Sequence, residues 1–179
     1  GGSGKRLFPF TSAINKSLLN INGKAVVDYA LNTLKQIGVE NVSVILGGDH
    51  FYQVINYLQG GERHGMNFNY VFQGQPDGIS SAINLCKRFV SDQDKFITIL
   101  GDNIYSDPIS FSESPNKAQI VLHKNKELNR FGVASIKDNK IVKIEEKPIV
   151  IDKQYDNYAI TGTYLFDQKF FDYFAKTKK

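Results

Sequence analysis

Residues 95–103 read KFITILGDN, and this stretch decides the fold. Its first six residues form an almost unbroken apolar run, which is typical of a strand that is buried on both faces of a sheet. The glycine, aspartate and asparagine that follow predict a turn at the end of this strand. Because parallel sheets are covered on both faces by helices, the stretch favours an α/β fold. Ligands of such folds bind beyond the carboxyl ends of the strands, which makes Asp102 the first candidate site residue.

Helix and strand patterns alternate along the part of the chain that precedes this stretch. Over residues 25–37, for example, apolar side chains recur at three- and four-residue steps, which predicts an amphipathic helix that Gly38 ends. This alternation predicts right-handed βαβ units and a Rossmann-like, three-layer fold with a mixed, mostly parallel central sheet. In chain order, the predicted elements are a helix at 25–37, a strand at 41–46, a helix at 50–58, a strand at 67–72, a helix at 79–90, strands at 95–100 and 118–123, a hairpin of 133–136 and 141–144 joined by the polar turn 137–140, a strand at 158–166 and a helix at 168–175.

Length and composition bound the class of protein. The chain has 179 residues, a length that fits one domain, so we predict a single domain over residues 1–179. No run approaches the ~18 apolar residues of a membrane span, and no apolar segment follows the N-terminal basic pair, so we expect neither a membrane partner nor a signal peptide. The single cysteine, Cys86, and three scattered histidines favour a reducing, cytoplasmic location and give no zinc-type spacing.

The formal net charge of +4 bears on the ligand. A basic chain can bind nucleic acid, but here the basic residues are dispersed among acidic ones. We therefore rank a small phosphorylated ligand above a nucleic acid.

The N-terminus contains a motif suited to phosphate. The segment Gly1-Gly2-Ser3-Gly4 allows the backbone to approach a ligand closely and to present successive N–H groups to phosphate oxygens. Arg6 can hold two oxygens of one phosphate, and Lys16 can neutralise another. The same four residues, taken alone, also read as an engineered linker.

Several further motifs, in order along the chain, resemble those of the sugar-phosphate nucleotidyltransferases, and most closely the glucose-1-phosphate thymidylyltransferases. That family has a glycine-rich segment followed by an Arg and, ten residues later, a Lys, as Arg6 and Lys16 are spaced here. Any one of these motifs is weak evidence for the family, whereas a chance occurrence of the whole set in the family's order is very improbable. The matching segments are GGSGKRLFP at 1–9, QGQPDG at 73–78, GDN at 101–103, FGV at 131–133, IEEKP at 144–148 and NYAITG at 157–162.

The sequence departs from the family pattern at both ends. The family's first strand precedes the glycines, and its second metal-binding Asp lies in a C-terminal motif that contains a Trp, whereas this chain has no Trp. We therefore expect this chain to be the front and middle part of such an enzyme, incomplete at both ends. Whether this part is active as a separate chain is left open by the sequence. A sheet without that first strand is expected to contain a gap or two exposed edges.

The resemblance implies a reaction in which a hexose 1-phosphate, expected to be glucose 1-phosphate, attacks the α-phosphorus of dTTP or UTP and releases pyrophosphate. Because both reactants are anions, catalysis there requires charge neutralisation and positioning. The roles that the resemblance implies are catalysis for Arg6, Lys16 and Asp102, with Asp102 also binding the cofactor Mg²⁺; nucleotide binding for Gly1, Gly2, Ser3, Gly4, Gln73 and Gly78; and sugar-phosphate binding for Gly132, Glu146, Lys147 and Thr161.

Other functions stay open at this point. A related enzyme could use CTP or another sugar, although the amide of Gln73 and the room left by Gly78 favour thymine or uracil. A domain of the same fold could bind a nucleotide-sugar without turnover, and the basic charge keeps a nucleic-acid module as the last alternative. The resemblance also leaves open a homo-oligomer and a product that serves polysaccharide biosynthesis.

Overall fold

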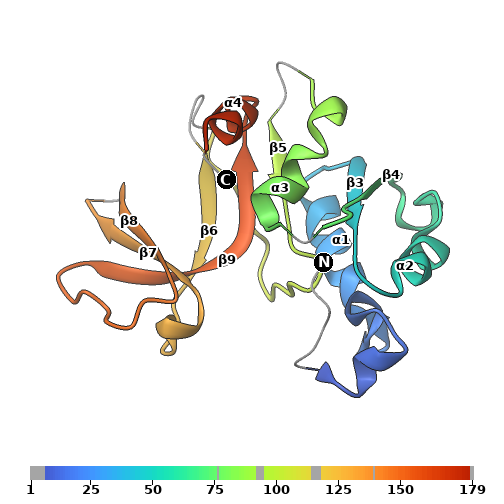
Figure 1. Ribbon diagram of the computed structural model, residues 1–179, viewed down its shortest axis with the longest axis horizontal. Coiled ribbons are helices and arrows are strands. Elements are labelled where there is room, and N and C mark those ends of the chain that lie inside the picture. Colours follow the sequence, from blue (N-terminus) through green and yellow to red (C-terminus); the bar gives the residue numbers. More distant parts are fainter. Residues whose placement is uncertain (1–6, 76, 92–94, 114–117, 139, 178–179) are drawn as a thin grey trace.

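The computed structural model describes residues 7–75, 77–91, 95–113, 118–138 and 140–177 (Figure 1). Its helices are α1 (Val26–Gln36), α2 (Phe51–Leu58), α3 (Ile79–Asn84) and α4 (Lys169–Lys176). Its strands are β1 (Asn20–Ile21), β2 (Lys24–Ala25), β3 (Asn41–Leu46), β4 (Asn67–Phe72), β5 (Phe96–Thr98), β6 (Gln119–His123), β7 (Gly132–Lys137), β8 (Lys140–Glu146) and β9 (Asp156–Phe166).

The strands form one parallel pair and one larger antiparallel sheet, besides the short β1–β2 hairpin. β3 and β4 run parallel and in register over six residue pairs, from Asn41–Asn67 to Leu46–Phe72. The five-stranded sheet has the order β5-β9-β7-β8, with β6 also on β9, and all of its pairings are antiparallel. The α/β fold class predicted from the sequence is therefore confirmed. Parallel pairing among the described strands is confined to β3 and β4.

A hydrophobic core lies where α1 and α2 pack on β3 and β4. The apolar face of α1 contributes Leu31 and Leu34, each 4% exposed, and α2 contributes Leu58, which is 1% exposed. Leu46 at the end of β3 completes the same cluster. Burial of these side chains stabilises this end of the molecule by the hydrophobic effect.

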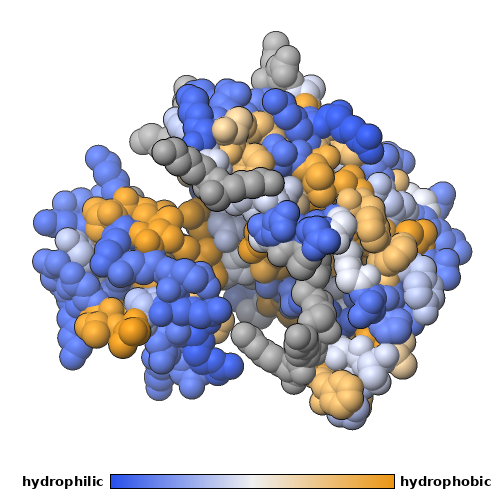
Figure 2. All heavy atoms as spheres, viewed as in Figure 1, coloured by the Kyte–Doolittle hydropathy of each residue, from blue (hydrophilic) through white to orange (hydrophobic). Residues whose placement is uncertain are grey.

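Aromatic rings join α4 to the antiparallel sheet. Phe171 of α4 is 2% exposed and stacks on Phe96 of β5 at 5.4 Å between ring centroids. Phe170 and Phe166 pack at 4.9 Å, so α4 covers the end of β9 (Figure 1). By contrast, the β7–β8 hairpin projects from the body, and apolar side chains of β8 and of the segment after it face solvent there (Figure 2). Ile149, for example, is 98% exposed.

Most predicted elements are present, but some differ in length. The strand predicted at 41–46 and the hairpin around 137–140 are confirmed. The helix predicted at 79–90 is wrong beyond Asn84, because the N–H groups of Leu85 and Cys86 bond to carbonyls three residues earlier and tighten the last turn. Phe89 then closes a separate 3₁₀ turn. The strand predicted at 95–100 is shorter in the structure, where only β5 (Phe96–Thr98) pairs with a neighbouring strand. The strand predicted at 158–166 begins two residues earlier, at Asp156 of β9.

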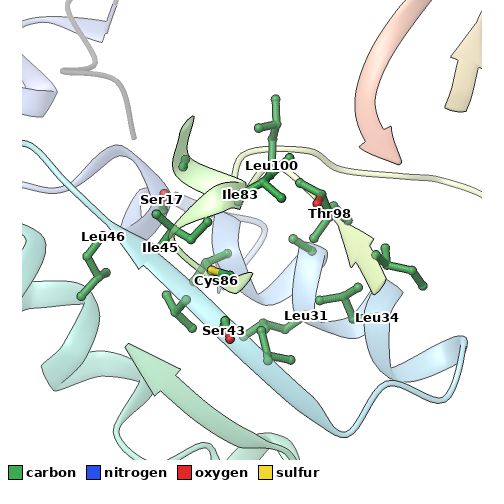
Figure 3. Close-up of a pocket in the computed structure, with 18 of the residues that line it drawn as sticks. Ser17, Leu31, Leu34, Ser43, Ile45, Leu46, Ile83, Cys86, Thr98 and Leu100 are labelled. Atoms are coloured by element: carbon green, nitrogen blue, oxygen red, sulfur yellow. The ribbon is translucent and has the colours of Figure 1, made fainter. Parts of the chain in front are cut away.

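β3 and β5 do not pair with each other, and a cavity of about 940 Å³ lies between them. Consecutive residues of both strands line it, as do side chains of α1 and α3 (Figure 3). A strand presents alternate residues on each face, so lining by consecutive residues means that the edges of β3 and β5 face the cavity. The sequence analysis expected either a gap or two exposed edges in the sheet, and the unpaired edges of β3 and β5 at this cavity are compatible with both alternatives.

In the part of the chain that the structure describes, no helix is both long enough and apolar enough to cross a membrane. The prediction of a single domain over residues 1–179 stays a prediction.

We expect the substitution Leu58→Ala to lower the free energy of unfolding by about 2–5 kcal/mol, because it opens a cavity in a fully buried site. Urea denaturation measured by circular dichroism checks this value. Ile149→Ala removes an exposed side chain and serves as the matched control, with an expected change within about 0.5 kcal/mol. Equal effects of the two substitutions would contradict the packing described for α2.

Candidate active site

Lys16 and Asp102 form an ion pair although they are 86 residues apart in the sequence. Their Nζ and Oδ2 atoms are 2.6 Å apart, and the side chains are 25% and 41% exposed. Lys16 begins the short 3₁₀ turn Lys16–Leu18, and Asp102 lies in the turn that follows β5. The structure therefore brings two of the predicted catalytic residues together. The third, Arg6, and the predicted nucleotide-binding segment Gly1-Gly2-Ser3-Gly4 lie outside the described residues.

The loop that carries Lys16 is anchored to α2 by side-chain amides. Asn15 caps the turn, because its Oδ1 accepts a hydrogen bond from the Ser17 N–H at 3.1 Å. Gln53 of α2 accepts from the Asn15 N–H at 2.8 Å and donates to the Ala13 carbonyl at 2.8 Å. The sequence analysis missed Gln53, since nothing in a single sequence indicates a contact over 38 residues.

The turn that carries Asp102 is held against β9. The Asn103 N–H closes the turn on the Leu100 carbonyl at 3.0 Å, and the Asn103 side chain donates to the Thr161 carbonyl at 2.6 Å. Gly162, next to Thr161, has a φ of +84°, and a Cβ there would overlap the Leu100 side chain. Glycine at this position therefore permits the close approach of β9 to the turn.

Gln73 and Gly78 line the same cavity as Lys16 and Asp102. The Gln73 N–H bonds to the Leu46 carbonyl at 2.7 Å, which continues the line of β3 and β4, and its side chain is buried. The Gln73 amide donates to the Gly78 carbonyl at 3.4 Å. Gly78 has a φ of +97°, which favours glycine, and no atom lies within 4 Å of the place that a Cβ would occupy. Four predicted residues thus gather beyond the carboxyl ends of strands, where α/β folds bind ligands.

The predicted sugar-phosphate residues lie on the antiparallel sheet instead. Gly132 of β7 pairs in register with Glu146 of β8, and a Cβ at Gly132 would be 3.1 Å from Glu146 Oε2. Lys147 follows with a φ of +46°, donates its N–H to Phe131 and places Nζ 3.5 Å from Glu146 Oε1. These three residues are neighbours, whereas Thr161 lies on β9. None of the four lines the cavity that holds Lys16 and Asp102.

Magnesium binding by Asp102 is a prediction that the donor set permits. Mg²⁺ in phosphate-transfer sites is bound by one or two carboxylates, with substrate phosphates and water completing six ligands. The partly exposed Asp102 carboxylate offers one such ligand at the cavity, and Lys16 occupies it here. Among the described residues, no group of three or more histidines, cysteines, aspartates or glutamates is placed to hold a metal without substrate.

Cys86 lies in the wall of the cavity and is 8% exposed. Burial raises the pKa of its thiol, an effect that a hydrogen bond with Ser43 and the charge of Arg88 partly offset. A thiol that ionises less readily is a poorer nucleophile, so Cys86 has the properties of a core residue.

Comparisons with known proteins show the family of the chain. A model of the nucleotidyl transferase family matches residues 1–179. The chain belongs to this family. It is 34% identical over 178 residues to the low-salt glycan biosynthesis nucleotidyltransferase Agl11 of Haloferax volcanii, covering 96% of this chain and 49% of that protein. It is 32% identical to the glucose-1-phosphate thymidylyltransferase of Xanthomonas campestris, covering 99% of this chain and 61% of that protein. The chain thus spans about half to three fifths of the length of these relatives.

Solved structures support the same fold. A Bacillus anthracis protein assigned as a glucose-1-phosphate thymidylyltransferase, solved with a bound sucrose, superposes with a TM-score of 0.91 at 38% identity. The match covers all of this chain and 73% of that one. A UDP-glucose pyrophosphorylase with bound UDP-glucose superposes with a TM-score of 0.77 at 22% identity. This match covers 99% of the present chain and 77% of the pyrophosphorylase chain. At that identity the second likeness shows the fold alone.

We expect Cys86 in the folded protein to react with a chromogenic disulfide reagent at pH 8 at least about tenfold more slowly than free cysteine, because thiolate is the reactive form. The rate is followed by absorbance, first in buffer and then in denaturing urea, where it should rise to that of an exposed thiol. Fast reaction of the folded protein would contradict the burial of Cys86.

Proposed function

We propose that this nucleotidyltransferase chain carries the nucleotide-binding and catalytic region of an enzyme that joins a hexose 1-phosphate to dTTP or UTP. Glucose 1-phosphate is the proposed sugar, and the products are a nucleotide-sugar and pyrophosphate. The observation that carries the proposal is the Lys16–Asp102 pair, which shares one cavity with Gln73 and Gly78. The thymidylyltransferases among the relatives agree with this choice of substrates.

The reaction requires little from the protein except charge and position. An oxygen of the sugar phosphate attacks the α-phosphorus in line, and the bond between that phosphorus and the bridging oxygen breaks, so pyrophosphate leaves with the electron pair. Lys16 lines the cavity, and from there its ammonium group would donate to phosphate oxygens and offset the repulsion between the two anions. Mg²⁺ held by Asp102 and the phosphates would neutralise further negative charge.

Recognition of the base is proposed for Gln73 and Gly78. An amide both donates and accepts hydrogen bonds, as the edge of thymine or uracil requires. The bond from Gln73 to the Gly78 carbonyl holds the amide in place before a nucleotide arrives. Gly78 leaves open space where a side chain would otherwise stand, which gives room to a ring.

A second candidate is a nucleotide-sugar-binding domain without turnover. The observation that favours it is again the Lys16–Asp102 pair, since the carboxylate proposed for a metal is bound by an ammonium group. In that case the same cavity would bind nucleotide and no pyrophosphate would form.

Pyrophosphate release with Mg²⁺, glucose 1-phosphate and each nucleoside triphosphate in turn tests the proposal. We expect release with dTTP or UTP, and a decrease of at least about 100-fold in kcat for Asp102→Asn and for Lys16→Ala, because each removes charge from the transition state. Asp172→Asn and Lys24→Ala make the same chemical changes at exposed positions outside the cavity and should retain wild-type rates.

Three results would decide between the candidates. Release with CTP and not with dTTP or UTP would contradict the role of Gln73. Thermal stabilisation by dTTP without release would favour the binding domain. Neither release nor stabilisation with any triphosphate would contradict both candidates.

A further inference from the structure

The hydroxyl group of Tyr105 lies at the centre of a hydrogen-bond network beside the turn that carries Asp102. Its oxygen is 3.0 Å from Thr161 Oγ1, 2.6 Å from Thr163 Oγ1 and 3.2 Å from Asn103 Nδ2. Thr163 is fully buried, and both threonines belong to β9. One side chain thus connects the turn to two positions on the strand.

The direction of each bond in this network can be assigned from the number of protons available. Thr161 uses its only hydroxyl proton on the Val121 carbonyl of β6, at 2.9 Å, so it must accept from Tyr105. Tyr105 has then used its own proton and must accept from Thr163 and from Asn103. Asn103 uses its two amide protons on Tyr105 and on the Thr161 carbonyl. Every hydroxyl and amide proton therefore has one acceptor.

This network continues the attachment of β5 to β9 beyond their backbone pairing. β5 and β9 pair over only three residues, and the last pair joins Thr98 to Tyr164. The chain then leaves the sheet to form the turn that carries Asp102. Beyond Thr98, side-chain bonds from Asn103 and Tyr105 connect this segment to β9.

We propose that Tyr105 is a positioning residue, which together with Thr163 and Thr161 fixes the Asp102 turn on β9. The significance of this position for catalysis rests on the function proposed above. Thr161 contributes here through its bonds to Tyr105 and Val121, which engage its hydroxyl proton. This role of Thr161 is separate from the sugar contact that the resemblance implied, and that contact stays a prediction.

Hydrogen exchange tests the network independently of activity. The Asn103 amide closes the turn on Leu100, so its exchange rate reports local opening. We expect at least a tenfold faster exchange of this amide in Tyr105→Phe and Thr163→Val, relative to the amides of α1. Thr163→Ser keeps the hydroxyl and should retain the wild-type ratio. Tyr158→Phe, on the same strand but outside the network, is the control for loss of a tyrosine hydroxyl.

Kinetics add a readout that a merely structural role would not move. In Tyr105→Phe, we expect kcat to fall about tenfold and the Mg²⁺ concentration for half-maximal rate to rise several-fold, with KM for the triphosphate within twofold of wild type. We expect Thr163→Val to change kcat and the Mg²⁺ dependence in the same direction as Tyr105→Phe. Thr163→Ser keeps the hydroxyl group and should have values of both quantities closer to those of the wild type.

Two results would overturn the proposal. One is an equal rise in exchange at Asn103 and throughout α1, which would mean that Tyr105 only stabilises the fold. The other is an unchanged Mg²⁺ dependence in an active Tyr105→Phe variant. A wild-type chain that releases no pyrophosphate would contradict the proposed function, and the exchange ratio would then decide the positioning role by itself.

Discussion

Backbone pairing of one long strand, β9, is the constraint on which the rest of the structure depends. β9 pairs with β5, β6 and β7, and α4 packs its phenylalanines over the end of it. The same strand approaches the Asp102 turn at Gly162, where only glycine leaves room for Leu100. The antiparallel sheet therefore determines the position of Asp102, which lies in the turn after β5. The predicted sugar-phosphate residues lie on this sheet too.

The candidate site is formed by two loops, each of which is anchored to a different part of the fold. Lys16 depends on a loop that Gln53 anchors to α2, whereas Asp102 depends on a turn attached to β9. Their ion pair joins the two parts at the cavity. A site of this kind suits a reaction between two anions, in which charge and position contribute more than a nucleophilic side chain. The properties of Cys86 agree, since burial raises the pKa of its thiol and so disfavours the thiolate that acts as a nucleophile.

Much of this fold could be predicted from the sequence, and the reasons for the differences are physical. The β3 pattern of branched apolar residues sets its bounds correctly, because burial of a strand leaves a periodic signal. The helix at 79–90 was predicted too long, because apolar periodicity does not distinguish an α-helix from the 3₁₀ turns that follow Asn84. The Gly-Asp-Asn motif indicated the Asp102 turn. Its attachment through Tyr105 was not predictable, since the partners lie more than 50 residues away on β9. The functional roles of all the predicted site residues, Lys16 and Asp102 included, stay predictions.

Under the function proposed above, the ion pair between Lys16 and Asp102 has a consequence for how a metal cation and a phosphate ligand would bind. A cation that arrives alone must displace the ammonium group from the carboxylate, and a phosphate that arrives alone must draw Lys16 away from its partner. Each ligand therefore binds against a competing interaction. When one of them has bound, the side chain that it releases is free to bind the other. Thermodynamic linkage makes this effect reciprocal, so the cation and the phosphate raise each other's affinity by the same factor. Positive cooperativity between the two proposed ligands would thus follow from a single contact within the free protein.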